Sequence, residues 1–282
     1  MKENVFTFLV GGRAGQGIKK VAKVASVLFS TDQRHVFQRD DYMSLIRGGH
    51  SFSVVSTTKE PINSSYNQAD LIVASDKRSY ENHIGQLKPQ GKMFFNSDDH
   101  DAKTGTGVSF SELAKKYDNP ELMFGVGAFA ILCAILGKHK GTMNQILKQE
   151  YPKNSFEVNR EYAEKVYDQV EKTHMGLFKL EKGKKTLPIL TGNKAIALGS
   201  IAAGLDVYFA YPMTPSTSIL HFLAKHKEKF NLGVIQPENE LSTINMAIGA
   251  TFSGAKAMVA TSGGGFALMA EGYSFAGMTE AP

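Results

Sequence analysis

The chain has 282 residues, of which 42% are hydrophobic and 21% charged, and its formal net charge is +5 at pH 7. Two domains are expected, because this length exceeds that of a typical single domain. The basic residues are scattered, which argues against a nucleic-acid interface, and no apolar run reaches about 18 residues, which argues against a membrane span.

The first predicted elements are a strand, a glycine-rich loop and a helix. The N-terminus leads directly into an apolar strand at 5–10, with no secretory hydrophobic region, so we expect a cytoplasmic protein. Gly11-Gly-Arg-Ala-Gly-Gln-Gly17 follows, and then a helical pattern at 18–29. This order can cradle an anion with bare backbone amides near a helix N-terminus. The candidate anion loop contains Gly12, Arg13, Gly15 and Gly17; a tight turn without a ligand is the alternative.

Strand and helix patterns then alternate, which indicates an α/β layered domain. We expect strands at 51–56, 69–74 and 92–95, and helices at 77–87, 111–117, 123–136, 143–150 and 154–172. The segment 176–190 contains glycines and the exposed-type run Lys182-Gly-Lys-Lys185, and we interpret it as a linker. The expected organisation is therefore a first domain at 1–175, a linker at 176–190 and a second domain at 191–282.

The single cysteine, Cys133, lies in the apolar helix of the first domain. One thiol cannot form an internal disulfide or hold an iron–sulfur cluster, which needs about four thiolates. We interpret Cys133 as a packing residue, with a reactive thiol as the alternative. His221 and His226 do not share a helix face, so the sequence predicts no metal site of its own.

The second domain begins with an alanine-rich helix at 191–204 and continues as three strand–loop–helix units. We expect strands at 208–211, 232–236 and 257–261, and helices at 217–226, 241–253 and 266–279. Tyr211-Pro-Met-Thr-Pro-Ser-Thr217 follows the first strand, and its two prolines predict a rigid turn that carries hydroxyl groups. Such turns at the carboxyl ends of strands are where open α/β sheets bind ligands.

Two carboxylates, Glu238 and Glu240, follow the second strand. We expect both, and Pro237, in the first turn of the next helix, where the helix dipole favours negative charge. On the residues alone, solvated first-turn acids and a catalytic acid are both open interpretations. Ser216 is the expected cap of the helix at 217–226.

These segments together resemble the α subunit of 2-oxoacid:ferredoxin oxidoreductases. The resemblance rests on 211–217, on Glu-Asn-Glu-Leu at 238–241 with Asn-Met-Ala-Ile-Gly-Ala at 245–250, and on Ala-Thr-Ser-Gly-Gly-Gly-Phe at 260–266 with Met-Ala-Glu-Gly at 269–272. The glycine loop and Arg47-Gly-Gly-His50 resemble the γ domain of the same enzymes. The sequence departs from the family pattern at Ala14, Lys194 and Gly264.

The resemblance implies an α/β fold: a Rossmann-like γ domain followed by a thiamine diphosphate pyrimidine-binding domain with a parallel sheet. Because relatives continue into a further strand, we expect the second domain to be truncated at its C-terminus. The resemblance also implies that Glu240 is catalytic and binds the cofactor, that Thr214 binds the 2-oxoacid, and that the γ-domain loop has a coenzyme A-related or docking role. The other residues expected at the site are Tyr211, Pro212, Pro215 and Ser216 for the substrate, and Gly263 and Gly264 for the cofactor.

The chain lacks a Gly-Asp-Gly segment followed by asparagine, the pattern that holds diphosphate through magnesium. The resemblance therefore implies a β subunit that brings the diphosphate half of the site, magnesium and an iron–sulfur cluster. The assembly would decarboxylate a 2-oxoacid, either 2-oxoglutarate or a broad range, reduce ferredoxin and release an acyl-CoA. The alternatives are a nucleotide- or coenzyme A-binding assembly module without catalytic residues, and a nicotinamide-dependent dehydrogenase. The last is disfavoured because Asp40 and Asp41 lie too far past the glycine loop, in an irregular context.

Overall fold

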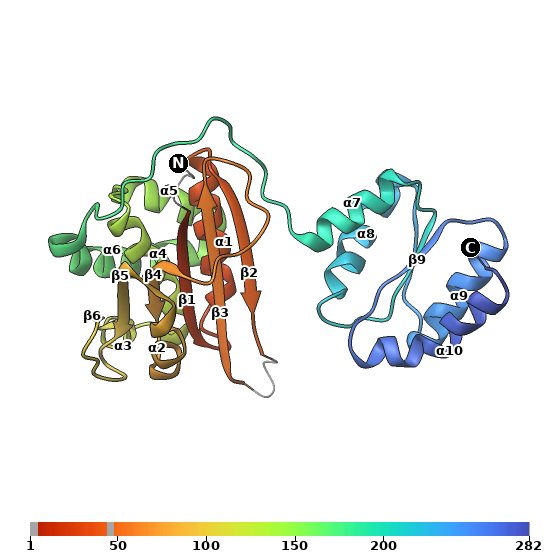
Figure 1. Cartoon of the computed structure of the whole chain (residues 1–282), viewed down its shortest axis with the longest axis horizontal. Helices are drawn as coiled ribbons and strands as arrows, with labels where there is room; N and C mark the ends of the chain where they lie inside the picture. The colour runs from red at the N-terminus through yellow and green to blue at the C-terminus, as the bar shows by residue number, and fades with distance from the viewer. Residues whose placement is uncertain (1–4, 44–47, 282) are drawn as a thin grey trace. The chain divides into compact units, whose positions relative to one another are not determined.

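The computed structural model describes residues 5–43 and 48–281. It divides into two compact units, Met1–Ile189 and Leu190–Pro282, whose elements are labelled in Figure 1. Arg47, part of the segment that resembles the γ domain, lies outside the described residues.

The first unit is built on a six-stranded sheet with the order β2-β3-β1-β4-β5-β6. β1 pairs with β4 in parallel and with β3 antiparallel, so the sheet is mixed and β1 has a parallel neighbour on one side only. Leu9 and its neighbours in β1 are buried on both faces of the sheet, as its apolar run predicts. The strands are β1 Phe6–Arg13, β2 His35–Asp41, β3 His50–Thr58, β4 Ala69–Ala74, β5 Leu87–Asn96 and β6 Thr106–Val108.

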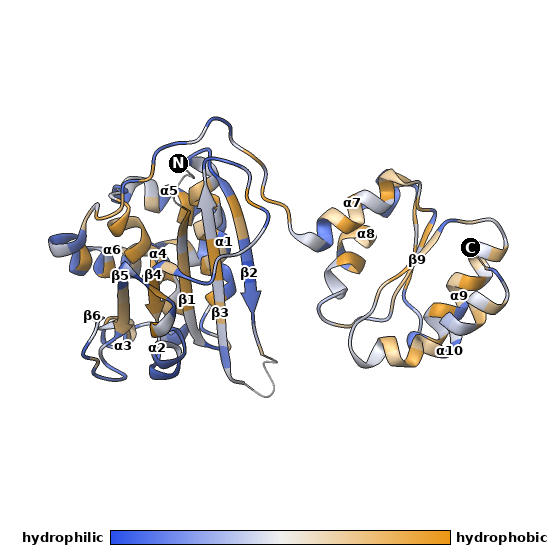
Figure 2. Cartoon of the chain, in the orientation of Figure 1, coloured by the Kyte–Doolittle hydropathy of each residue, from blue (hydrophilic) through white to orange (hydrophobic). Residues whose placement is uncertain are grey.

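The helices of the first unit cover both faces of this sheet. α1, α4 and α6 contribute to the larger apolar core, and α2 packs on the opposite face. Figure 2 shows hydrophobic residues concentrated on β1, β4, β5 and α4. The helices are α1 Ile18–Thr31, α2 Lys77–His83, α3 Phe110–Ala114, α4 Met123–Ile135, α5 Lys140–Glu150 and α6 Lys153–His174, with short 3₁₀ turns at Ile84–Gln86 and Pro120–Leu122.

Two sequence-based expectations for this unit need correction. Asp40 and Asp41 are not in an irregular context; they lie in β2, paired with Ser53 and Phe52 of β3. The helix expected at 77–87 ends at His83, because the chain tightens into a 3₁₀ turn before β5. Neither β2 nor the three-residue β6 was predicted.

Cys133 lies within α4, a helix that is buried on all sides because it is apolar on all sides. Its side chain is fully buried, and burial raises the pKa of the thiol. An un-ionised thiol without solvent contact is a poor nucleophile, so the structure supports the packing interpretation.

The segment after α6 returns to the end of α1. Ser30 Oγ donates to the carbonyl oxygen of Leu187 at 2.6 Å, and the Gly183 amide donates to that of Asp32 at 3.0 Å. A Cβ on Gly183 would lie 1.7 Å from the carbonyl oxygen of Gln33, so only glycine fits this contact. Lys182, Lys184 and Lys185 are exposed, as expected. Gly183, which lies between Lys182 and Lys184, is bound to the end of α1 by its amide.

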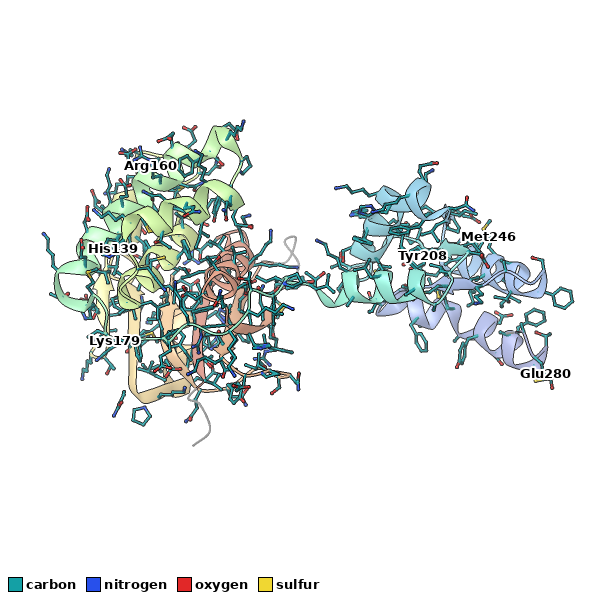
Figure 3. The ribbon with its side chains drawn as sticks, turned by 90° about the horizontal axis from the view of Figure 1, so that it is seen from above. His139, Arg160, Lys179, Tyr208, Met246 and Glu280 are labelled. Atoms are coloured by element: carbon teal, nitrogen blue, oxygen red, sulfur yellow. The ribbon has the colours of Figure 1, made fainter. Side chains whose placement is uncertain are left out.

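The second unit has a three-stranded parallel sheet with the order β8-β7-β9. Tyr208, in the central strand, is fully buried (Figure 3), whereas Met246 on α9 is exposed. The strands are β7 Val207–Phe209, β8 Gly233–Ile235 and β9 Ala257–Val259, and the helices are α7 Gly192–Ala202, α8 Thr217–Phe230, α9 Glu240–Phe252 and α10 Gly264–Met278. Every expected element is present. No helix among the residues described in either unit could span a lipid bilayer.

Candidate functional site

The loops at the carboxyl edge of the second sheet form the candidate site. Since β7, β8 and β9 are parallel, the loops that follow them leave from one edge. Ser262 Oγ, in the loop after β9, donates to the carbonyl oxygen of Thr214, in the loop after β7, at 2.7 Å. The Ala210 amide donates to the carbonyl oxygen of Ile235, at the end of β8, at 3.2 Å. The first bond joins two of the segments on which the family resemblance rests, and the second joins the ends of β7 and β8, from which the other loops leave.

Glu240 is the first residue of α9, and its carboxyl group is enclosed. Asn239 caps the helix with its side chain, which accepts a hydrogen bond from the Ser242 amide at 2.9 Å. Glu240 is 3% exposed, and its Oε1 atom is buried without a hydrogen-bond partner among the described residues. Burying a carboxyl oxygen without a partner is unfavourable by about 1–3 kcal/mol, which makes Glu240 a candidate for contact with a ligand.

Glu238 has a different environment. Pro237 and Glu238 precede α9 instead of lying in its first turn, because the helix begins only after the Asn239 cap. Glu238 is exposed, and a hydrogen bond donated by the Ser242 hydroxyl lowers the pKa of its carboxyl group. Of the two candidate acids, only Glu240 can act in an enclosed site.

Gly265 lies against the carboxyl group of Glu240. It lies in the first turn of α10 and is buried. A Cβ on Gly265 would lie 2.5 Å from Glu240 Oε1 and 2.1 Å from Thr261 Oγ1. Thr261 Oγ1 is also buried without a partner. Sequence reasoning missed Thr261 and Gly265 as site residues, although both lie within the segment on which the resemblance rests.

Gly263 and Gly264, predicted to contact the cofactor, lie at the start of α10 and are exposed. A Cβ on either would meet no atom within 4 Å. Gly263 has a φ of 53° and a ψ of −124°, a backbone conformation that side chains disfavour. Open space therefore lies beside Gly263 and Gly264, and the role of these two glycines in binding the cofactor stays a prediction.

The proline-containing turn presents a mixed surface. Tyr211, Thr214 and Pro215 are exposed, Pro212 is half-buried and Ser216 is buried. The Thr214 hydroxyl makes no hydrogen bond to the residues described here, so it is available to a ligand.

Ser216 does not cap α8 with its side chain, contrary to expectation. Its hydroxyl donates to the carbonyl oxygen of Met213 at 2.7 Å. The reason is its helical backbone conformation, with φ −70° and ψ −22°, because a capping side chain needs an extended residue.

The glycine loop of the first unit is more closed than predicted. β1 continues through Gly12 to Arg13, and three loop amides already donate within the chain: Arg13 to Gln16 Oε1, Ala14 to Gly49 O and Gln16 to Arg13 O. The expected set of bare amides is therefore wrong for these three. Gly15 and Gly17 have φ values of 98° and 74°, which explains why glycine stands there.

A cavity of about 350 Å³ lies beside this loop. Arg13 lines it, at 3.7 Å from Asp76 and 3.8 Å from Asp99. Because these carboxylates offset the guanidinium charge, the cavity suits a polar ligand with hydroxyl or amino groups better than a bare phosphate. Its polar lining includes Arg13, Gln16, Ser75, Asp76, Asn96 and Lys115.

Two histidines are hydrogen-bonded at the start of β3. His50 Nε2 and His83 Nε2 are 2.7 Å apart, and His50 Nδ1 lies 3.2 Å from Ser79 Oγ. Burial lowers the pKa of both imidazoles. In 5–43 and 48–281, no three His, Cys, Asp or Glu side chains gather as a metal ion would need.

The fold is α/β, and the loops at the carboxyl edge of the second sheet bring Glu240, Thr261 and Gly265 together. Residues 7–169, more than half of the chain, match the family described as pyruvate ferredoxin/flavodoxin oxidoreductase. Residues 198–282 match the description pyruvate flavodoxin/ferredoxin oxidoreductase, thiamine diphosphate-binding. The chain belongs to the pyruvate ferredoxin/flavodoxin oxidoreductase family.

Relatives extend this comparison. The chain is 25% identical over 335 residues to the 2-oxoacid:ferredoxin oxidoreductase subunit alpha of Sulfolobus sp, covering 98% of this chain and 53% of the relative. It is 45% identical over 96 residues to the 2-oxoglutarate synthase subunit KorA of Archaeoglobus fulgidus, covering 34% and 28%. The chain thus spans about half the length of the first of these curated relatives.

A solved structure confirms the fold. The 2-oxoglutarate:ferredoxin oxidoreductase from Magnetococcus marinus, with 2-oxoglutarate, coenzyme A and succinyl-CoA bound, matches with a TM-score of 0.84. The match covers 100% of this chain and 51% of that chain, at 24% sequence identity.

Proposed function

We propose that this chain is the γ–α portion of a 2-oxoacid:ferredoxin oxidoreductase. In this proposal the second unit supplies the aminopyrimidine side of a thiamine diphosphate site, and Glu240 is the catalytic acid. The observation that carries the proposal is the enclosed, unpartnered Oε1 of Glu240 at the carboxyl edge of a parallel sheet.

The residues present fit this cofactor. An aminopyrimidine ring offers a ring nitrogen, and Glu240 offers a buried carboxyl oxygen without a partner, Oε1. Because Gly265 has no side chain, Glu240 Oε1 and Thr261 Oγ1 can lie against the first turn of α10. Glu240 would hold a proton against the ring nitrogen, which is the role of a positioned general acid–base. When bound, thiamine diphosphate supplies the electron sink for breaking the bond between the carboxylate and the keto carbon of the substrate.

Thr214 is the proposed substrate-binding residue. Its exposed hydroxyl is a neutral donor that can bind the carboxylate of a 2-oxoacid without the desolvation of a second charge. The turn is held by the bond from Ser262 and by Asn193, whose side chain donates to the carbonyl oxygen of Pro215 at 2.7 Å. The similarity to the KorA subunit supports 2-oxoglutarate as the substrate, with a broad range of 2-oxoacids as the alternative.

The proposed assembly includes a β subunit. That subunit would bring the diphosphate half of the site, magnesium and an iron–sulfur cluster, and ferredoxin would accept the electrons. Coenzyme A would be the acyl acceptor. The polar cavity beside Arg13 in the first unit suits the hydroxyl, amide or amino groups of coenzyme A, not its phosphates, and to that extent it supports a coenzyme A-related role for that unit.

The test compares Glu240→Gln with Glu238→Gln in the complex formed with the β subunit. The assay is 2-oxoglutarate- and coenzyme A-dependent reduction of ferredoxin. We expect Glu240→Gln to lower kcat by about 10²–10⁴-fold, the range for loss of a general acid–base. Glu238→Gln is the matched control and should retain activity, because Glu238 is exposed. Full activity in Glu240→Gln would refute the assignment.

The second candidate function is a nucleotide- or coenzyme A-binding assembly module, favoured by the same cavity. It predicts coenzyme A binding by the chain together with a complex whose activity does not respond to Glu240→Gln. Measuring both quantities on one preparation separates the two functions.

A further inference from the structure

Thr261 lies in the loop between β9 and α10, where it has an unexplained hydroxyl group. The Oγ1 atom is buried and has no partner within the described chain. The next residue, Ser262, uses its hydroxyl to bond the carbonyl oxygen of Thr214 at 2.7 Å. Packing alone does not account for Thr261, because valine has nearly the same shape and would bury no polar atom.

The Thr261 hydroxyl and the Glu240 carboxyl are neighbours. Both oxygens crowd the position that a Cβ on Gly265 would occupy, at 2.1 Å and 2.5 Å. A carboxylate only accepts hydrogen bonds, whereas a hydroxyl can donate one. Thr261 can therefore donate to Glu240, although the two side chains do not make this bond in the structure.

We propose that Thr261 is a positioning residue for Glu240. Its hydroxyl donates to one carboxyl oxygen and thereby holds the other toward the aminopyrimidine ring of thiamine diphosphate. This inference rests on the proposed function of the second unit. It gives both orphaned oxygens one explanation, since each is satisfied only when the ligand fixes the carboxyl group.

The experiment measures thiamine diphosphate binding rather than turnover alone. The complex of the chain with its β subunit is titrated with thiamine diphosphate at saturating Mg²⁺, and near-ultraviolet circular dichroism reports the bound ring. The variants are Thr261→Val, Thr261→Ser, Glu240→Gln and the double variant Glu240→Gln/Thr261→Val. Thermal unfolding of the chain alone controls for folding.

Thr261→Val is expected to weaken apparent binding by about tenfold or more, the value of one hydrogen bond to a charged group. Thr261→Ser should restore binding, because it keeps the donor. The double variant should bind no worse than Glu240→Gln, because the two side chains act as one unit. The unfolding temperature of Thr261→Val should not fall, since no existing hydrogen bond is removed.

The outcomes distinguish the role of Thr261 from the proposed function of the second unit. Normal binding by Thr261→Val together with weak binding by Glu240→Gln overturns the role of Thr261 and leaves the proposed function standing. Additive losses in the double variant also overturn that role, because they show independent action. Normal binding by both Thr261→Val and Glu240→Gln also overturns the role of Thr261, whereas full activity in Glu240→Gln ends the proposed function itself.

Discussion

Gly265→Ala tests the close approach of Glu240 and Thr261 to the first turn of α10. The added methyl group would lie 2.1 Å from Thr261 Oγ1 and 2.5 Å from Glu240 Oε1, well inside contact distance. We expect this overlap to cost about 1–3 kcal/mol, the usual range for overpacking. Alanine in place of glycine in a helix gains up to about 1 kcal/mol. The net effect should therefore lie between neutral and a loss of about 2 kcal/mol.

Gly249→Ala is the matched control. Gly249 is exposed in α9, and a Cβ there would meet no atom within 4 Å, so this variant should keep the full gain of about 1 kcal/mol. For a unit of this size, that gain corresponds to a rise of about 4–8 °C in unfolding temperature.

Differential scanning calorimetry of the full chain measures both variants. The transition of the second unit should rise with Gly249→Ala and stay level or fall with Gly265→Ala. An equal rise in unfolding temperature in the two variants would show that the carboxyl group of Glu240 does not lie against α10.

Three further predictions concern the rest of the chain. Gly183→Ala should lower the transition temperature of the first unit in the same calorimetry, because its methyl group would overlap a backbone oxygen 1.7 Å away; an unchanged transition would contradict the contact. His50 and His83 have pKa values below 6.5, so the unfolded chain binds more protons than the folded one. The free energy of unfolding of the first unit should be at its full value above pH 6.5 and should fall as the pH drops from 6.5 through the lowered pKa values of the two histidines. His50→Gln should make this fall smaller. Parallel pH curves for the variant and the parent would contradict a contribution from His50. Tyr208→Phe should not destabilise the second unit, because the buried Tyr208 hydroxyl has no partner within 5–43 and 48–281. Tyr162→Phe, in contrast, should lower the free energy of unfolding of the first unit by about 1 kcal/mol, because the Tyr162 hydroxyl donates to a backbone oxygen.

The order of elements was predictable from the sequence because most of them have distinct patterns. α4 is apolar on every face and is buried on every face. β2 was missed because its residues, His-Val-Phe-Gln-Arg-Asp-Asp, belong to a half-exposed edge strand without an apolar run. Pairing with β3 therefore decides its conformation, and pairing is not a local property.

The sequence predicted the segments of the candidate site but not the contacts between them. The resemblance selected Glu240, yet the residues alone could not separate it from Glu238, because both follow the same strand. Their difference arises from tertiary structure: only Glu240 lies against α10. The contact of the Ser216 hydroxyl was likewise not predictable from residue type. Serine at this position favours a helix cap, but the helical backbone conformation of Ser216 directs its hydroxyl to the carbonyl oxygen of Met213.

The two unsatisfied oxygens under α10 also bear on how this protein would respond to directed evolution. Since each lowers the stability of the unliganded chain, a screen that rewards heat resistance alone would tend to replace the acid at 240 and the hydroxyl at 261 with apolar groups. Heat-resistant variants from such a screen would have lost the two oxygens on which the proposed site rests, so any thermostabilisation programme should keep both positions fixed.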